Sequence, residues 1–157
     1  MKQSGNPPVL HRDQPLGPAA NGYSQAQVPV AGFECALIEG SPDAALVRVA
    51  GELDIATAPI LQRTLRETCN RAGVVVLDLR ELTFMDSSGL RVVIDACRDA
   101  ARDERLLLRL RGPAHVERVF EITGTAASIA ILDETSADPA VRDLLVLDGS
   151  PEQGDRA

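Results

Sequence analysis

Aromatic residues are scarce in this chain of 157 residues, which contains no tryptophan, one tyrosine and three phenylalanines. Because 45% of the residues are nevertheless hydrophobic, the core must be built from aliphatic side chains. The length is typical of one domain and is sufficient to bury a single sizeable core. We therefore expect one folded domain with an aliphatic interior.

Positive charge is also in short supply: 16 Lys and Arg residues stand against 23 Asp and Glu residues, a net charge of −7. Binding to a phosphate backbone needs clustered cations, so no nucleic-acid partner is expected. No apolar run approaches the ~20 residues of a membrane span, and the N-terminus lacks the apolar core of a signal peptide. These absences predict no membrane partner and a cytoplasmic location.

Cysteine and histidine, the usual metal ligands, are few. Cys35, Cys69 and Cys97 are widely spaced and form no paired motif, which favours buried free thiols over disulfides. His11 and His115 are the only histidines, and nothing near either supplies further ligands. We expect neither a metal site nor a cofactor.

The first 30 residues combine five prolines with glycine, glutamine and asparagine and show no hydrophobic period. Such a segment cannot bury enough apolar area to offset the entropy lost on ordering. The predicted organisation is a disordered extension over residues 1–30, a folded domain over residues 31–148 and a flexible tail over residues 149–157.

Short apolar runs alternate with helical periodicity from residue 33 onward. Strands are predicted at 33–38, 44–50, 74–79, 106–110 and 128–132, and helices from Thr57 to Gly73, Ser88 to Arg102, Pro113 to Gly124 and from Ser136 onward. The predicted inner faces of three helices are Leu61, Leu65, Thr68 and Ala72; Leu90, Val93, Ile94 and Cys97; and Val141, Leu144 and Leu145. This alternation after an initial hairpin predicts an α/β fold: a mixed, mostly parallel sheet of about five strands with about four helices packed on it.

The most informative segment, residues 84–90, reads FMDSSGL and lies between a predicted strand and a predicted helix. Asp, Ser and Gly are the residues that cap helices. A serine in that position is exposed beside backbone N–H groups that have no partner within the helix, which suits a phosphate. On these residues alone, ordinary helix capping is the simpler explanation.

Two further segments change that interpretation: residues 51–58 read GELDIATA, and residues 116–124 read VERVFEITG. Together with LTFMDSSGL at 82–90, they resemble in order and spacing the STAS domain of bacterial anti-sigma factor antagonists. The resemblance covers about residues 33 to 148. It implies a sheet with helices packed on it and the Asp-Ser turn at one exposed end.

The resemblance also implies a function. Ser87, directly after Asp86, corresponds to the phosphorylated serine. The unphosphorylated protein is then expected to bind an anti-sigma factor that is itself a serine kinase, and so to release a sigma factor. Phosphorylation ends the binding and a serine phosphatase restores it. The implied partner-binding residues are Asp54, Asp86, Ser87, Ser88 and Gly89, in a chain that is not an enzyme and is a monomer or weak dimer.

Structural roles stay open for several of these residues. Asp86 could serve only as the N-cap and Asp54 only as a turn former. Ser88 is expected at the first helical position with a structural role, and Gly89 is expected to allow the helix start to approach its surroundings closely.

Two other functions are weighed against this one. A serine hydrolase would need a Gly-x-Ser-x-Gly elbow, but Met85 and Asp86 precede Ser87, and the only candidate base in the folded region, His115, has no recognisable orienting acid. The second alternative is a STAS-fold signalling or scaffold module whose partner is unrelated to sigma factors.

Overall fold

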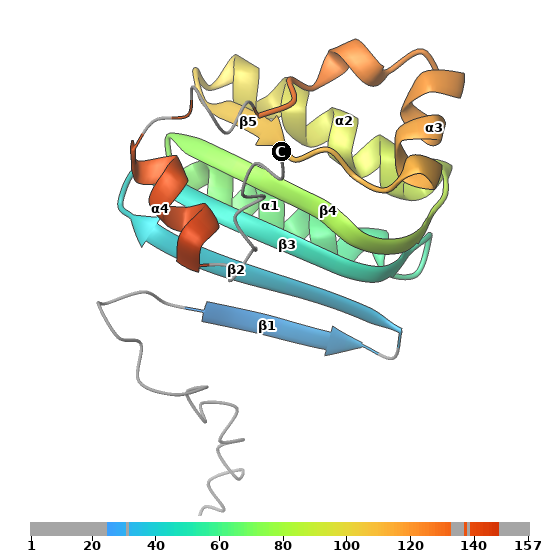
Figure 1. Cartoon of the computed structure of the whole chain (residues 1–157), viewed down its shortest axis with the longest axis horizontal. Helices are drawn as coiled ribbons and strands as arrows, with labels where there is room; N and C mark the ends of the chain where they lie inside the picture. Colours follow the sequence, from blue (N-terminus) through green and yellow to red (C-terminus); the bar gives the residue numbers. More distant parts are fainter. Residues whose placement is uncertain (1–24, 31, 133–136, 138, 148–157) are drawn as a thin grey trace, which may run out of the picture.

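The computed structural model describes residues 25–30, 32–132, 137 and 139–147, and its framework is a five-stranded sheet in the order β1-β2-β3-β4-β5 (Figure 1). Strands β1 (Gln25–Val30), β2 (Phe33–Ser41) and β3 (Ala44–Leu53) form an antiparallel meander. Strands β4 (Val74–Met85) and β5 (Leu106–Arg109) add to β3 in parallel. The predicted mixed α/β sheet is confirmed.

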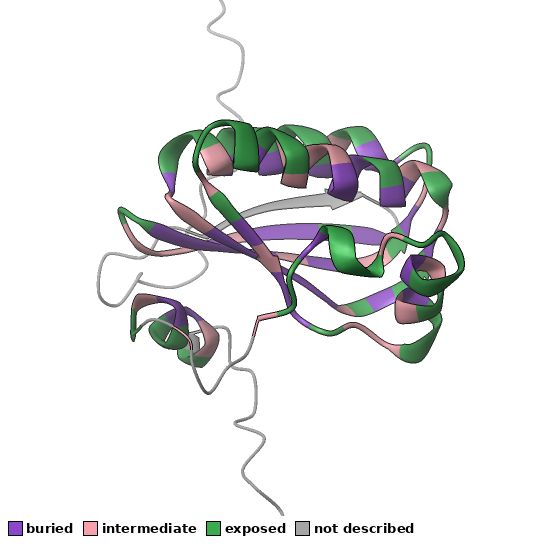
Figure 2. Ribbon diagram, turned by 90° about the horizontal axis from the view of Figure 1, so that it is seen from above, coloured by how far each residue is buried: buried purple, intermediate pink, exposed green. Residues whose placement is uncertain are grey.

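In the part of the chain that the structure describes, four α-helices pack against this sheet. Figure 2 shows α1 (Ala58–Arg71) and α2 (Ser87–Arg102) side by side over one face and α4 (Pro139–Leu147) on the other. Helix α3 (Ala114–Ile122) packs against β4 and is followed by a short 3₁₀ helix, η1 (Ala126–Ser128). The helices thereby cover apolar side chains on both faces of the sheet. The carboxyl ends of β3 and β4 lie side by side where these two strands stop.

The core consists of two apolar clusters, one on each face of the sheet. The larger lies under α1, α2 and α3 and is aliphatic except for Phe33, Phe120 and sulfur-containing side chains. The smaller lies under α4. The predicted inner faces are buried, except that Cys97 and Leu145 are half-buried: Leu61, Leu65, Thr68 and Ala72 in and after α1; Leu90, Val93 and Ile94 in α2; Val141 and Leu144 in α4.

The last six residues of the extension predicted over 1–30 form β1 in the structure and pair with β2 from Gln25↔Ile38 to Val30↔Phe33. Strand β1 is stabilised by pairing with the backbone of β2. The composition of residues 25–30 does not reveal that another strand lies beside them. Pro29 is compatible with this position because an edge strand tolerates a missing N–H donor. Residues 1–24 and the predicted tail over 149–157 lie outside the described residues.

The predicted strand over 128–132 is also wrong. Residues Ala126–Ser128 form η1, and only Ile131 makes an isolated parallel bridge to Arg109. The Ser128 N–H donates to the Thr125 carbonyl within η1, and the backbone bonds that follow involve only Arg109, the last residue of β5, so the pairing stops at one bridge. Strand β4, by contrast, continues to Met85, well past the predicted end at Leu79, because β3 runs beside it to Leu53.

Candidate functional site

Strands β3 and β4 end side by side, and their ends bring two distant segments of sequence together. Leu53 and Met85 are paired in the parallel register. The Asp86 N–H, in the residue that follows, donates a hydrogen bond to the Leu53 carbonyl at 3.2 Å. The turns that begin at Asp54 and at Asp86 therefore share one edge of the sheet.

The Asp86 turn is a capped helix start. Asp86 is the N-cap of α2, and its Oδ1 accepts hydrogen bonds from the Ser88 N–H at 2.8 Å and the Gly89 N–H at 3.1 Å. Ser87 occupies the first helical position and is exposed, whereas Ser88 follows it and is half-buried. The expectation that Ser88 is the first helical residue was thus wrong by one position, because α2 begins directly after Asp86.

Gly89 allows α2 to start against β3. A Cβ atom at this buried position would lie 2.6 Å from the Leu53 Cγ and 3.0 Å from the Leu53 carbonyl oxygen. Both distances are shorter than ordinary van der Waals contact between side-chain and backbone atoms. The absence of a side chain at Gly89 is what lets the two turns lie in contact.

The Asp54 turn is closed by its own side chains. The Asp54 Oδ1 accepts hydrogen bonds from the Ala56 N–H at 2.9 Å and the Thr57 N–H at 3.1 Å. The Thr57 hydroxyl lies 2.9 Å from the Glu52 carbonyl and accepts from the Asp54 N–H, also at 2.9 Å. Thr57 precedes α1 as predicted, but its hydroxyl bonds backward to the turn and makes no cap bond to the helix.

The paired turns and the strand ends that lead into them carry three acidic and two apolar residues. Glu52 is exposed, and Asp54 and Asp86 are half-buried. Ile55 is 77% exposed and Phe84 is 48% exposed, and Phe84 pairs with Glu52 across β3 and β4. Sequence reasoning missed Ile55, although an isoleucine placed between turn-forming residues was a signal for an exposed apolar group.

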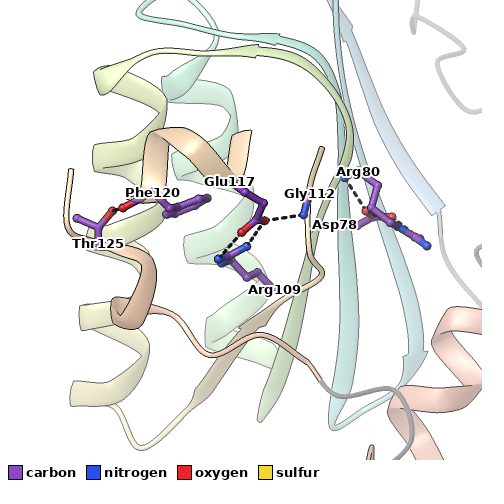
Figure 3. A network of polar contacts seen from close by, with 7 residues as sticks. All are labelled: Asp78, Arg80, Arg109, Gly112, Glu117, Phe120 and Thr125. Carbon is purple, nitrogen blue, oxygen red and sulfur yellow. Dashed lines mark hydrogen bonds and ion pairs between the residues drawn. The ribbon is translucent and has the colours of Figure 1, made fainter. Parts of the chain in front are cut away.

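The motif at residues 116–124 has a different role from the two turns. Its residues hold α3 in place (Figure 3). The Glu117 carboxylate accepts hydrogen bonds from both terminal nitrogens of Arg109, at 3.0 Å for Nη2, and from the Gly112 N–H at 2.7 Å. The Arg109 guanidinium is buried and lies 4.3 Å from the centroid of the Phe120 ring. Burial raises the pKa of Glu117, but the Arg109 and Gly112 hydrogen bonds and the charges of Arg109 and Arg111 outweigh it, so the net pKa is lowered.

Within the described ranges, no group of three or more His, Cys, Asp or Glu side chains could hold a metal ion. The part of the chain that the structure describes also contains no helix that is long and apolar enough to cross a membrane. Burial raises the pKa of all three cysteine thiols, that of Cys69 to about 11, which disfavours the reactive thiolate.

Comparison with known proteins defines the class of this domain. A family model described as the STAS domain matches residues 36–139, and the chain belongs to this family. Anti-sigma-B factor antagonists from Listeria monocytogenes and Listeria innocua are each 36% identical to it over 84 residues, which is 53% of this chain and 74% of theirs. The antagonist from Staphylococcus aureus is 32% identical over 81 residues, or 50% of this chain and 73% of its own length.

Two solved structures have the same fold. The anti-sigma factor antagonist SpoIIAA in its unphosphorylated form matches with a TM-score of 0.55 at 20% identity, over 76% of this chain and 96% of that one. An anti-sigma factor antagonist from Mycobacterium paratuberculosis matches with a TM-score of 0.51 at 21% identity, over 80% of this chain and 97% of its own.

Proposed function

We propose that this chain is an anti-sigma factor antagonist that docks an anti-sigma factor through the edge formed by the Asp54 and Asp86 turns. The observation that carries the proposal is the Asp86 N–H to Leu53 carbonyl bond, which joins the two motifs into one surface. The curated relatives bear the same functional name. Docking releases the sigma factor that the anti-sigma factor otherwise holds.

The anti-sigma factor is a serine kinase in this proposal, and its target is Ser87. The Ser87 side chain is exposed at the start of α2, whereas Ser88 is half-buried and therefore harder for a kinase to reach. A phosphoserine adds about −1.5 to −2 charges. At a helix N-terminus that charge is favourable by roughly 0.3–1 kcal/mol, so the fold tolerates it.

Phosphorylation acts on docking more than on folding. At an interface, adverse placement of a charge costs several kcal/mol, which exceeds the helix contribution, and each 1.4 kcal/mol is about tenfold in affinity. Phosphoserine at Ser87 therefore weakens docking by about a hundredfold or more. A serine phosphatase restores the docking form.

The protein itself performs no catalysis in this scheme and uses no cofactor. The serine-hydrolase alternative would need His115 as its general base. The His115 Nε2 lies at hydrogen-bond distance, 3.0 Å, from the Leu82 carbonyl and is engaged there. We place the protein in the cytoplasm, as a monomer or weak dimer that binds neither nucleic acid nor membrane.

The test uses each purified serine-kinase anti-sigma factor encoded in the same genome, incubated with the chain and ATP. Mass spectrometry should show one phosphate on the wild type and on the matched control Ser88→Ala, and none on Ser87→Ala. Calorimetry should show that Ser87→Ala still binds the kinase, and that Ser87→Asp binds more weakly with a nearly unchanged melting temperature. Phosphate on Ser88 would contradict the assignment of the site. A chain that binds none of these kinases would instead be a STAS-fold scaffold with a non-sigma partner.

A further inference from the structure

The docking edge contains a large apolar side chain that the fold does not need. Ile55 is 77% exposed, although it lies between Asp54 and Ala56 in a turn whose hydrogen bonds are all made by other groups. An exposed isoleucine contributes little to stability because its side chain stays in water. Neither the core nor the turn explains why an isoleucine stands at this position.

The turn holds Ile55 in place before any partner arrives. Asp54 accepts hydrogen bonds through Oδ1 from the N–H groups of Ala56 and Thr57, and its carbonyl accepts from the Ala58 N–H at 2.8 Å. A side chain on a backbone that is already ordered loses less entropy on binding than one on a free loop. Ile55 therefore meets a requirement for an efficient contact residue.

The surroundings of Ile55 match the usual anatomy of an interface. Phe84, 48% exposed, contributes a second apolar surface from the adjacent strand, beside Glu52. Glu52, Asp54 and Asp86 carry negative charge around this edge. The exposed Arg91 in the first turns of α2 pairs with Asp95 at 3.6 Å. An apolar centre with a charged rim is the arrangement in which a few residues carry most of the binding energy.

We infer that Ile55 is the apolar anchor of the docking surface, with Phe84 as a second exposed apolar side chain at the ends of β3 and β4, and that Ile55 inserts into an apolar pocket on the anti-sigma factor. The rim of that pocket carries Arg or Lys side chains where it faces Glu52 and Asp54, whereas the part that faces Ser87 carries no cation that could pair with a phosphate. This inference rests on the proposed function and deepens it. It assigns binding affinity for the anti-sigma factor to a residue outside the Asp86 turn, and it states the chemistry of the partner surface.

The test compares Ile55→Ser with a matched control, Val146→Ser. Val146 is 67% exposed and lies on α4, which covers the face of the sheet opposite α1 and α2. The probe is the purified serine-kinase anti-sigma factor from the same genome that binds the wild type. Calorimetry should show Kd raised at least tenfold by Ile55→Ser, changed less than twofold by Val146→Ser, and largely restored by Ile55→Leu. Both serine variants should keep the wild-type melting temperature, since neither side chain is buried.

The possible outcomes separate this inference from the proposed function. If the wild type bound none of the kinases, both would fall. If the wild type bound and Ile55→Ser bound equally well, only the anchor would be wrong. Sedimentation of the chain alone covers a different occupant: loss of self-association in Ile55→Ser, with unchanged kinase affinity, would show that Ile55 binds a second copy of this chain and would overturn the inference.

Discussion

Replacing Gly89 with alanine tests how closely the two turns of the docking edge must approach. The added methyl group would lie 2.6 Å from the Leu53 Cγ and 2.8 Å from the Leu53 Cδ2. Carbon atoms ordinarily pack at about 3.5–4.0 Å, so either the start of α2 retreats by about 1 Å or the fully buried Leu53 leaves its preferred rotamer. Overpacking of this kind costs about 1–3 kcal/mol.

A second glycine provides the matched control. A Cβ at Gly73, the residue before β4, would meet only the Asp43 carbonyl oxygen at 3.6 Å, which is ordinary contact. Alanine reduces the entropy of the unfolded chain by about the same amount at both positions, about 0.4–1 kcal/mol of stabilisation where the backbone suits it. The difference between Gly89→Ala and Gly73→Ala therefore isolates the clash with Leu53.

Urea denaturation of the two variants should show Gly89→Ala less stable than Gly73→Ala by about 1–3 kcal/mol at equal m-values. Gly89→Ala should also bind the anti-sigma factor more weakly, because retreat of α2 moves Ser87 relative to the Asp54 turn. Equal stability of the two variants would refute the argument that the Leu53 contact requires a glycine.

Three further predictions concern the scaffold. Val93 is fully buried in α2, so Val93→Ala should lower the free energy of unfolding by about 1–3 kcal/mol, and a change of only a few tenths in urea denaturation would contradict the packing. Glu117→Gln leaves the buried Arg109 guanidinium without its counter-charge and should cost about 1–3 kcal/mol at neutral pH, less than for a fully buried pair, because Glu117 is only partly buried and glutamine keeps an oxygen acceptor. Because the pKa of Glu117 is lowered in the folded state, its contribution is present above the unfolded pKa and is lost as pH falls through the folded pKa; the variant should lack that part of the acid dependence. Deletion of residues 1–24 should leave stability and docking unchanged, whereas deletion of residues 1–31, which removes β1, should lower the thermal midpoint.

The helices were predictable because their signals are local. A residue's position on a helical turn depends on its neighbours three and four places away, so the buried stripe of α2 was visible in the spacing of Leu90, Val93 and Ile94. The cap at Asp86 was visible for the same reason, since its side chain bonds N–H groups only two and three residues onward. The start of α2 was predicted one residue too late, at Ser88. Asp and Ser are both common capping residues, so the sequence only weakly indicates which residue is the first of the helix.

Pairings between segments were less visible. The sequence alone determined an aliphatic α/β domain, the inner faces of its helices and the serine turn, because these depend on composition and on near neighbours. Only the tertiary structure decided that residues 25–30 form a strand, that Arg109 is buried against Glu117, and that Ile55 is exposed in the Asp54 turn, which meets the Asp86 turn at the ends of β3 and β4. Each of these depends on which strand or helix lies alongside, and that is set by sheet register and packing across long separations in the chain.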